Sequence, residues 1–371
     1  MMENKIQSWP DWLPIRADLT GLSPYGAPQI SGVVSLNTNE NPFALPEKLV
    51  ADMLSQLPQV LRNLNRYPDR DATELRSALA GYINGQNGSN FQVENIWAAN
   101  GSNEILQTLM LAFGARRVLG FVPSYSMHPL IAKVVGSEWI EGPRSSDFSL
   151  DLADALAKIA EFQPGLTFVT TPNNPTGTSL TIAEIEELAR ATKNIKGLLI
   201  VDEAYAEFSN EKSAVTLVKD FPNVVVVRTM SKAFAFAGAR VGYLVGAKEI
   251  SEAMLVTRLP YHLSSMTQAI AQIAIGHAKE LLGEVAILKA ERNRIASALT
   301  EMGFNVLPSA ANFLAFTGFT AHNGDASANW QALLADGVLI RDIGIPGYLR
   351  VTVGTPDENS KFLAAVAKLK P

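Results

Sequence analysis

Short apolar segments alternate with helical patterns through the middle of this chain. The apolar segments have the length and hydrophobicity of buried strands, and they occupy residues 96–99, 118–122, 166–170, 198–201, 224–227 and 241–245. Most of them are separated by residues with helical periodicity, at 105–113, 127–135, 151–162 and 181–192. Strands that alternate with helices predict a largely parallel sheet with helices on both faces.

Polar side chains follow the ends of several of these predicted strands. They belong to Tyr125, Asn174, Asp202, Tyr205 and Lys232. Ligands of open α/β sheets bind at the carboxyl ends of the parallel strands. A single polar residue at such a place is usually a cap or a turn, but several that suit one ligand predict a binding site.

Lys232 stands in unusually apolar company within the stretch 228–242. Burying an ammonium group is costly, so a lysine in such surroundings has a lowered pKa and can attack a carbonyl carbon. Thr229, Ser231 and Arg240 could together hold a phosphate beside it. A reactive lysine next to a phosphate site suggests pyridoxal 5'-phosphate (PLP), which carries both an aldehyde and a phosphate. The alternative at this point is a surface lysine at the end of a strand.

PLP would give a role to each polar residue around its ring. Lys232 would form the Schiff base, and once displaced by a substrate amine it could carry a proton between two carbons. Asp202 would pair with the pyridinium nitrogen. Tyr205 and Asn174 would hydrogen-bond the phenolic oxygen, and Tyr125 would stack on the ring.

The phosphate end of PLP would lie at the start of a helix. The sequence after the strand 96–99 is a glycine turn followed by capping residues and a strong helix. The free amides at a helix start and its positive dipole favour an anion. We therefore expect the backbone amides of Ser102 and Asn103 to bind the phosphate, together with Thr229, Ser231 and Arg240.

Composition excludes several other classes of function. The net charge of −5 and the pI of about 5.5 favour neither nucleic acid nor an anionic membrane surface as a partner. The chain has no cysteine, which excludes disulfides and thiolate chemistry. Its four histidines lack ligand spacing, so no metal site is predicted. The polar residues 1–11 and the lack of a long apolar segment predict no signal peptide, no membrane span and a cytoplasmic location.

The length of 371 residues predicts more than one domain. We expect an N-terminal arm over residues 1–45, a large domain over 46–258 that holds the parallel sheet, and a smaller α/β domain over 259–371. The smaller domain is expected to contain helices at 264–300, 326–335 and 357–369 and strands at 305–307, 312–316, 338–340 and 349–353.

The first helix of the large domain is expected over residues 46–62. Its apolar residues recur at helical spacing and should share one face. They are Leu49, Val50, Met53, Leu54 and Leu57.

Longer motifs around these residues resemble those of a known family. A resemblance to PLP-dependent aminotransferases with the aspartate-aminotransferase fold (fold type I) rests on Asn-Asn-Pro-Thr-Gly at 173–177, Asp-Glu-Ala-Tyr at 202–205 and Ser-Lys-Ala-Phe from 231 through Arg240. A closer resemblance, to the histidinol-phosphate aminotransferases, rests on Leu-Asn-Thr-Asn-Glu-Asn-Pro at 36–42, Arg-Tyr-Pro-Asp at 66–69, Gly-Ser-Asn-Glu at 101–104, Leu-Ile-Arg-Asp at 339–342 and Leu-Arg-Val-Thr-Val-Gly at 349–354. One departure is mild: Asn103 stands where many members carry an aspartate.

This resemblance implies further residues and a partner. It implies that Tyr67 reaches the cofactor phosphate of a neighbouring subunit, in a homodimer with shared active sites. It also implies that Arg350 anchors the acidic group of the substrate, where an arginine fork suits a carboxylate or a phosphate. Arg341 is expected as a second cation, while Tyr25 and Asn41 are expected to border the substrate.

The function implied by the resemblance is transfer of an amino group between L-glutamate and imidazole-acetol phosphate, which yields L-histidinol phosphate and 2-oxoglutarate. Two alternatives share most of these motifs, an aromatic-amino-acid aminotransferase and a PLP-dependent decarboxylase of threonine phosphate. A regulator that binds DNA through an added segment is disfavoured, because the chain has no basic helix-turn-helix segment and is acidic.

Overall fold

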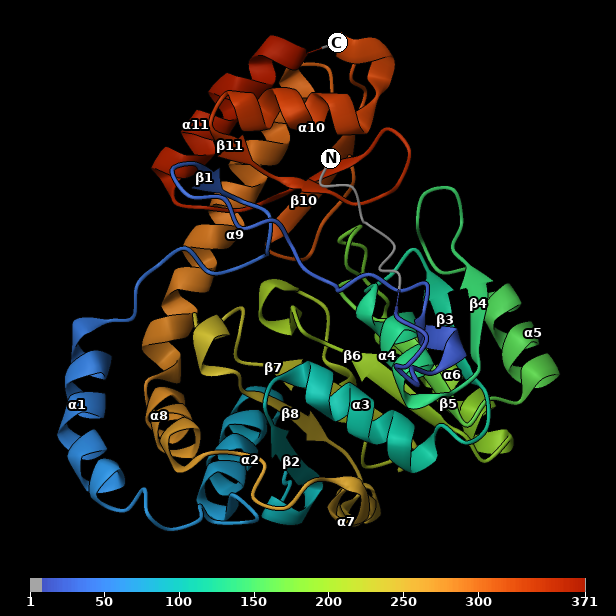
Figure 1. The fold of residues 1–371 in the computed structure, drawn as a ribbon, viewed down its shortest axis with the longest axis vertical. Helices are drawn as coiled ribbons and strands as arrows, with labels where there is room; N and C mark the ends of the chain where they lie inside the picture. Colours follow the sequence, from blue (N-terminus) through green and yellow to red (C-terminus); the bar gives the residue numbers. More distant parts are fainter. Residues whose placement is uncertain (1–8, 371) are drawn as a thin grey trace.

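The computed structural model describes residues 9–370, and within them the largest sheet has seven strands (Figure 1). In spatial order the strands are β2 (Ile96–Ala99), β8 (Gly242–Val245), β7 (Val224–Thr229), β6 (Leu198–Asp202), β5 (Leu166–Thr170), β3 (Val118–Val122) and β4 (Trp139–Pro143). Only β8 opposes the others in this sheet, since it pairs antiparallel with both β2 and β7. The predicted mostly parallel sheet is confirmed, with the edge strand β4 added to it.

Helices cover both faces of this sheet. One face packs against α3 (Ser102–Phe113), α4 (Met127–Val135) and α7 (Lys248–Thr257), and the other against α2 (Thr73–Asn87), α5 (Leu152–Phe162) and α6 (Ile182–Asn194). Neighbouring residues of a strand alternate between the two cores: Ile200 of β6 belongs to the first, and Leu199 and Val201 to the second. A capping box of Thr181 and Glu184 starts α6.

A smaller four-stranded antiparallel sheet lies beyond the large one. Its order is β12 (Arg341–Asp342), β13 (Leu349–Thr352), β10 (Phe313–Thr317) and β9 (Asn305–Val306). The helices α10 (Ala326–Ala335) and α11 (Pro356–Val366) belong to this end of the molecule (Figure 1). In β12 and β13, Arg341 lies directly opposite Arg350.

The N-terminal segment pairs with this smaller end of the molecule. Its strand β1 (Val34–Ser35) runs parallel to β11 (Val338–Leu339), with Val34 opposite Val338. The segment that follows crosses toward the large sheet, where Asn37, Thr38, Asn39 and Glu40 reach its strand ends. The sequence does not predict β1, because two residues are too few for a periodic signal.

Two consecutive helices join the large and small sheets. They are α8 (Ser265–Gly276) and α9 (Ala278–Glu301), and the helical conformation is interrupted between them at His277. Helix α8 packs on α1 (Glu47–Arg62) and α2, whereas α9 continues to the small sheet. The division into an arm, a large and a small domain stays a prediction, and its first eight residues and Pro371 lie outside the described residues. We propose that the change of domain falls at His277 rather than near residue 258.

Helix α1 differs from the prediction in what it buries. Only Leu49 and Met53 of the expected apolar face are buried, whereas Val50 is 38% and Leu54 63% exposed. Helical spacing places these residues near each other but does not tell which part of the helix surface another element covers. Among the described residues, no helix is both long and apolar enough to cross a lipid bilayer.

Candidate active site

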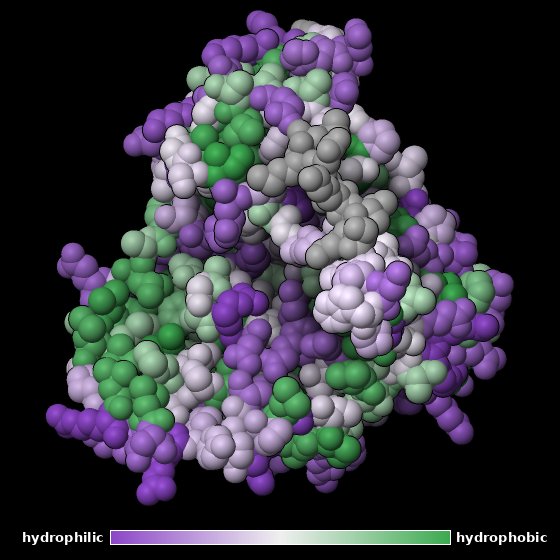
Figure 2. All heavy atoms as spheres, in the orientation of Figure 1, coloured by the Kyte–Doolittle hydropathy of each residue, from purple (hydrophilic) through white to green (hydrophobic). Residues whose placement is uncertain are grey.

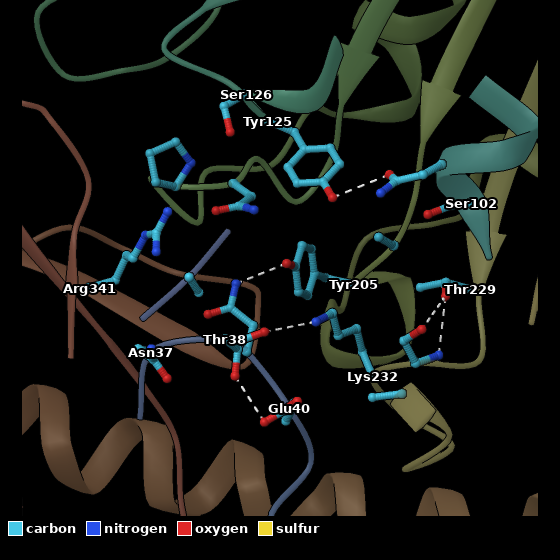
Figure 3. A pocket seen from close by; sticks show the side chains of 18 of the residues that line it. Asn37, Thr38, Glu40, Ser102, Tyr125, Ser126, Tyr205, Thr229, Lys232 and Arg341 are labelled. Carbon is cyan, nitrogen blue, oxygen red and sulfur yellow. Dashed lines mark hydrogen bonds between the residues drawn. The ribbon is translucent and has the colours of Figure 1, made fainter. Parts of the chain in front are cut away.

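A cavity of about 640 Å³ lies where the strand ends of the large sheet meet the N-terminal segment and β12–β13. Every candidate residue predicted from the sequence lines this cavity, except Tyr67 and Asn41. The candidates that line it are Tyr25, Ser102, Asn103, Tyr125, Asn174, Asp202, Tyr205, Thr229, Ser231, Lys232, Arg240, Arg341 and Arg350. Figure 3 shows several of these side chains converging on one space from separate parts of the chain.

Lys232 follows β7 and points across the cavity toward the N-terminal segment (Figure 3). Its Nζ donates a hydrogen bond of 2.9 Å to the carbonyl oxygen of Thr38. Burial, together with the positive charge of nearby Arg350, lowers the pKa of Lys232 to about 8. A larger fraction of this amine is therefore neutral near pH 8 than for an ordinary lysine, which favours nucleophilic attack.

Asp202 ends β6 and lies at the bottom of the cavity. The residue is 2% exposed, and its Oδ2 lies 3.0 Å from Nε2 of His128. The backbone amide of Ala204 donates to Oδ1 at 3.2 Å. A carboxylate held in this way can accept a proton or pair with a cationic nitrogen that enters the cavity.

A group of small donors lies beside Lys232. The hydroxyl of Thr229 donates to that of Ser231 at 2.9 Å, and Nη1 of Arg240 approaches the same Ser231 oxygen at 3.4 Å. Across from them begins α3, after Gly101 with φ of 84°. A Cβ at Gly242 would lie 2.3 Å from the amide nitrogen of Ser102, so glycine there lets the strand approach the helix start closely.

This group of donors suits an anion. Backbone amides at a helix start, hydroxyl groups and an arginine are the donors that bind phosphate in proteins. The guanidinium of Arg240 lies so close to Gly101 that a Cβ added to Gly101 would lie 2.4 Å from Nη2 of Arg240. The sequence analysis predicts that these residues share a phosphate, and the structure brings them together.

Two arginines face the opposite part of the cavity. Arg350 is 7% exposed, donates 2.9 Å from Nη2 to the carbonyl of Asn37, and donates from Nη1 to Oδ1 of Asn174. Burial lowers its pKa to about 10. Its guanidinium lies 5.1 Å from the ring centroid of Phe313, a cation–π contact.

The Nε of Arg350 is buried and, within residues 9–370, finds no hydrogen-bond acceptor. Arg341 lies directly opposite on the neighbouring strand. Two like charges at opposed positions repel each other, and an unpaired buried donor is costly. An anion between the two arginines would relieve both costs, so this end of the cavity suits an acidic group of a ligand.

Two tyrosines stand between the anion-binding ends. Tyr205 is buried, and Nδ2 of Asn39 donates to its hydroxyl oxygen at 2.9 Å. Burial raises the pKa of Tyr205 to about 12, so the phenol keeps its proton. The hydroxyl of Tyr125 donates to Oδ1 of Asn103 at 3.2 Å, and its ring meets that of His128 edge-on.

Asn41 and Tyr67 do not line this cavity. Oδ1 of Asn41 accepts from the amide of Phe43 at 3.0 Å, whereas Asn37 and Asn39 of the polar loop 36–42 line the cavity. Tyr67 is 80% exposed and stacks on Tyr261 at 4.5 Å between ring centroids. Because Asn41 does not line the cavity, its expected substrate-binding role stays a prediction, as does the role of Tyr67 in a neighbouring subunit.

His128 supports the site through Asp202, but the sequence does not single it out. It is 1% exposed and holds Asp202, and its ring also contacts Phe168. Its distance of 74 residues from Asp202 in the chain hides the contact. A usable signal was its place in the helix just after Tyr125, since that helix begins at a strand end of the same sheet edge.

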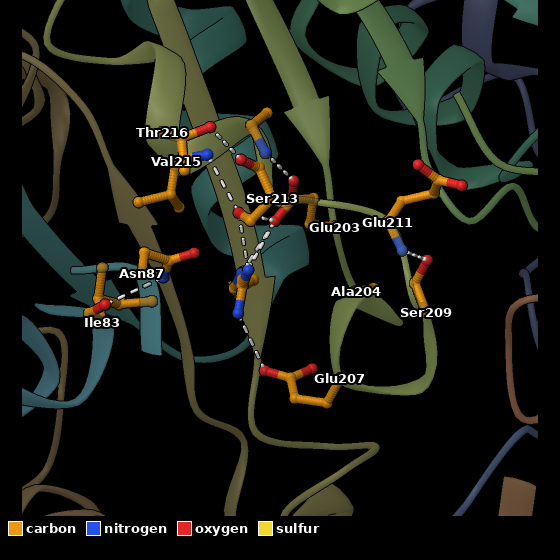
Figure 4. A network of polar contacts seen from close by, with 12 residues as sticks. Ile83, Asn87, Glu203, Ala204, Glu207, Ser209, Glu211, Ser213, Val215 and Thr216 are labelled. Atoms are coloured by element: carbon orange, nitrogen blue, oxygen red, sulfur yellow. Dashed lines mark hydrogen bonds and ion pairs between the residues drawn. The ribbon is translucent and has the colours of Figure 1, made fainter. Parts of the chain in front are cut away.

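A buried ion network connects residues that follow β6 with the end of β7 (Figure 4). Arg228 donates from Nη2 to Oε2 of Glu203 at 2.8 Å and from Nη1 to Oε1 of Glu207 at 3.2 Å. Glu203 also accepts from the hydroxyl of Ser213 at 2.7 Å. Because Glu203 follows Asp202 and Arg228 precedes Thr229, the pair joins the two strand ends that carry the site. Removing one partner from such a buried pair typically costs about 3–5 kcal/mol.

Comparisons with known proteins place this chain in a family. Residues 31–366 match the family model described as aminotransferase class I and II. The chain belongs to the class I and II aminotransferase family. The family predicted from the motifs is therefore confirmed, and so is the prediction that the protein is an aminotransferase.

Two similar relatives within this family carry the same name. The histidinol-phosphate aminotransferase of Mycobacterium avium is 54% identical over 362 residues, which cover 97% of this chain and 89% of the relative. The protein of the same name from Mycolicibacterium vanbaalenii is 54% identical over 363 residues, or 97% of this chain and 96% of the relative.

Solved structures show the same fold. The histidinol-phosphate aminotransferase of Clostridium acetobutylicum has a TM-score of 0.80 at 24% identity and covers 90% of this chain and 98% of its own. That of Sinorhizobium meliloti, solved in complex with pyridoxal-5'-phosphate, has a TM-score of 0.80 at 24% identity and covers 90% of each chain. The predicted aspartate-aminotransferase type of fold is confirmed by an aspartate aminotransferase of Thermus thermophilus with a TM-score of 0.80.

Proposed function

We propose that this protein uses PLP, held by Lys232, to exchange an amino group between L-histidinol phosphate and 2-oxoglutarate. The observation that carries the proposal is one cavity with an amine of lowered pKa between two separate anion sites. One anion site, at the start of α3, suits the cofactor phosphate. The other, at Arg350 and Arg341, suits the acidic group of the substrate.

The residues present fit PLP at each of its polar ends. The amides of Ser102 and Asn103 would hold the phosphate with Thr229, Ser231 and Arg240. The glycines at 101 and 242 support this fit, because side chains there would fill the space in front of the amides and the guanidinium. Asp202 would bind the ring nitrogen and, being a buried carboxylate, would keep a proton on it.

When bound, PLP withdraws electrons from the substrate carbon that carries the amino group. The chain's own residues would then do the positioning and the proton transfer. Nζ of Lys232, freed by the incoming amine, would take a proton from that carbon and deliver it to a second carbon. Tyr205 would donate to the phenolic oxygen with Asn174 beside it, and Tyr125 would cover one face of the ring. Tyr25, 50% exposed at the rim of the cavity, would lie next to the substrate.

The paired arginines support a phosphorylated substrate. A phosphate monoester carries close to two negative charges, and Arg341 opposite Arg350 supplies two positive ones. The carboxylate of glutamate needs only one arginine fork, so the same place can bind either partner in turn. The relatives named histidinol-phosphate aminotransferase support this choice of substrate over other phosphate esters.

The direct test follows the spectrum of the PLP-loaded protein in two half-reactions. Histidinol phosphate alone should bleach the visible band, glutamate alone should do the same, and 2-oxoglutarate should restore it. If glutamate leaves the spectrum unchanged, amino transfer with it is wrong. Faster bleaching by phenylalanine would favour the aromatic-amino-acid aminotransferase, and release of carbon dioxide from threonine phosphate would favour the decarboxylase.

We also propose a homodimer. Exposed apolar side chains gather over α1 and the segments beside it, and Figure 2 shows this apolar face over α1. We call these residues the apolar patch: Val50, Leu54, Leu61, Leu64, Tyr67, Tyr261 and Met266. Large exposed apolar patches are typical of interaction sites. A second copy placed on the patch would also bring Tyr67 near its partner, which supports the predicted role of that residue. The cytoplasmic location stays a prediction.

Leu54→Asp should convert the dimer into a monomer. The leucine is 63% exposed at the patch, and a charge buried there without a partner costs several kcal/mol. Sedimentation velocity measures the change, and Leu111→Asp, at a leucine 53% exposed on α3 outside the patch, serves as the matched control. Unchanged sedimentation of Leu54→Asp, or a monomeric unsubstituted protein, would rule out this interface.

A further inference from the structure

Asn39 joins three separate parts of the molecule at one buried point. It is 2% exposed and comes from the N-terminal segment. Its side chain contacts Thr352 of β13 and Tyr205 of the large domain, and its carbonyl accepts from Nδ2 of Asn312 at 3.1 Å. Its φ of 54° lies in the left-handed region, which asparagine tolerates better than most residues.

The hydrogen bonds around Asn39 have only one consistent direction. The backbone amide of Asn39 donates to Oγ1 of Thr352 at 3.0 Å, and the Thr352 hydroxyl donates to the side-chain Oδ1 of Asn39 at 3.0 Å. If the side-chain amide were turned over, the buried Thr352 proton would lose its acceptor among the described residues. Thr352 therefore fixes the oxygen of Asn39 on its own side and turns the NH₂ group toward Tyr205.

This direction determines what the Tyr205 hydroxyl can do. The phenol has one proton, and its oxygen already accepts from Nδ2 of Asn39 at 2.9 Å. The proton cannot point back at that donor, so it is left for the cavity that Tyr205 lines. A hydroxyl that accepts a hydrogen bond also becomes a stronger donor, because hydrogen bonds in a chain polarise one another.

We propose that Asn39 is a positioning residue that turns the hydroxyl proton of Tyr205 toward the cavity, and so toward the phenolic oxygen of PLP. The proposal rests on the proposed function, because it needs PLP in the cavity. It assigns Thr352, on the same strand as Arg350, the task of orienting Asn39. The substrate-binding strand and the cofactor ring would then be linked through one asparagine.

Loss of the Asn39 side chain should therefore shift the pH dependence of the visible spectrum and leave the fold unchanged. The visible band of PLP attached to lysine changes with pH as one proton is lost, and a donor to the phenolic oxygen favours the form without that proton. Removing or misdirecting the donor therefore raises the pH midpoint. The charged groups around this point are left unchanged by the substitution, and they are Glu40, Asp202, Lys232, Arg240, Arg341 and Arg350.

The experiment compares pH midpoints of the visible band in four PLP-loaded proteins. They are the unsubstituted protein, Asn39→Gly, Tyr205→Phe and the double variant. Glycine keeps the left-handed backbone and removes only the side chain. The loss of one hydrogen bond corresponds to a rise in the pH midpoint of about half a pH unit to one pH unit for Asn39→Gly. We expect a larger rise for Tyr205→Phe and no further rise in the double variant, because Asn39 acts through Tyr205.

Asn312→Ala is the matched control. Asn312 donates to the backbone carbonyl of Asn39 but takes no part in the hydrogen bonds that link the side chains of Thr352, Asn39 and Tyr205. Its midpoint should equal that of the unsubstituted protein. If Asn39→Gly does not fold, Thr352→Val tests the same orientation and should also raise the midpoint. An unchanged midpoint in the folded variant, or an equal rise in the Tyr205→Phe background, would overturn the inference. Absence of any visible band from the unsubstituted protein would instead overturn the proposed function.

Discussion

Lys232→Ala should abolish the visible band of the PLP-loaded protein and lower kcat/KM by at least about 10⁴-fold. The substitution removes both the amine that captures the aldehyde and the group that moves the proton. Proton transfer by a positioned side chain alone contributes about 10²–10⁴-fold. Absorbance and steady-state kinetics measure the two effects, and the melting temperature should stay close to that of the unsubstituted protein, because Lys232 is only partly buried and has one hydrogen bond, to Thr38.

Lys248→Ala is the matched control for this prediction. Lys248 is an exposed lysine at the start of α7, outside the cavity. Its removal should change neither the band nor the rate. A visible band that persists in Lys232→Ala at full intensity would mean that another amine holds the cofactor.

Asp202→Asn should lower kcat by about 10²–10³-fold while the visible band remains. Asparagine has nearly the same shape, so the hydrogen bond from the Ala204 amide can persist. What is lost is the negative charge opposite the ring nitrogen, and removing one such electrostatic group typically costs about 10²–10³ in kcat. The band should remain, since Lys232 and the phosphate donors are unchanged.

Kinetics with histidinol phosphate at saturating 2-oxoglutarate measure the effect of Asp202→Asn. Asp220→Asn, at an exposed aspartate after β6 and away from the cavity, is the matched control and should leave kcat unchanged. A kcat for Asp202→Asn within about twofold of the unsubstituted value would show that this carboxylate does not set the charge of the ring.

The order of strands and helices in the sequence was enough to predict the parallel sheet and many of the residues that line the cavity. Parallel strands place their carboxyl ends at one edge, so the positions of Asp202, Thr229 and Tyr125 follow from the order of the elements alone. Arg350 came from the family resemblance, because a lone arginine in a strand gives no local signal. The edge strand β4 was missed, since its Glu-Gly-Pro end breaks the apolar pattern.

Contacts between distant segments account for what the sequence could not predict. The loop 36–42 was recognised, but the way Asn39 enters the cavity depends on its own left-handed backbone and on Thr352, which is 313 residues away in the chain. His128 likewise depends on Asp202 for its position. The exposure of Leu54 depends on which surface of α1 is covered by α8.

The central claim is that the amine at position 232 holds the cofactor between the two anion sites. Reduction of the PLP-loaded protein with borohydride, followed by mass spectrometry of its peptides, locates the attachment directly. We predict that the cofactor mass appears on Lys232 alone, at close to one per chain. Modification of a different lysine, or a protein that carries no cofactor mass after reduction, would contradict the account.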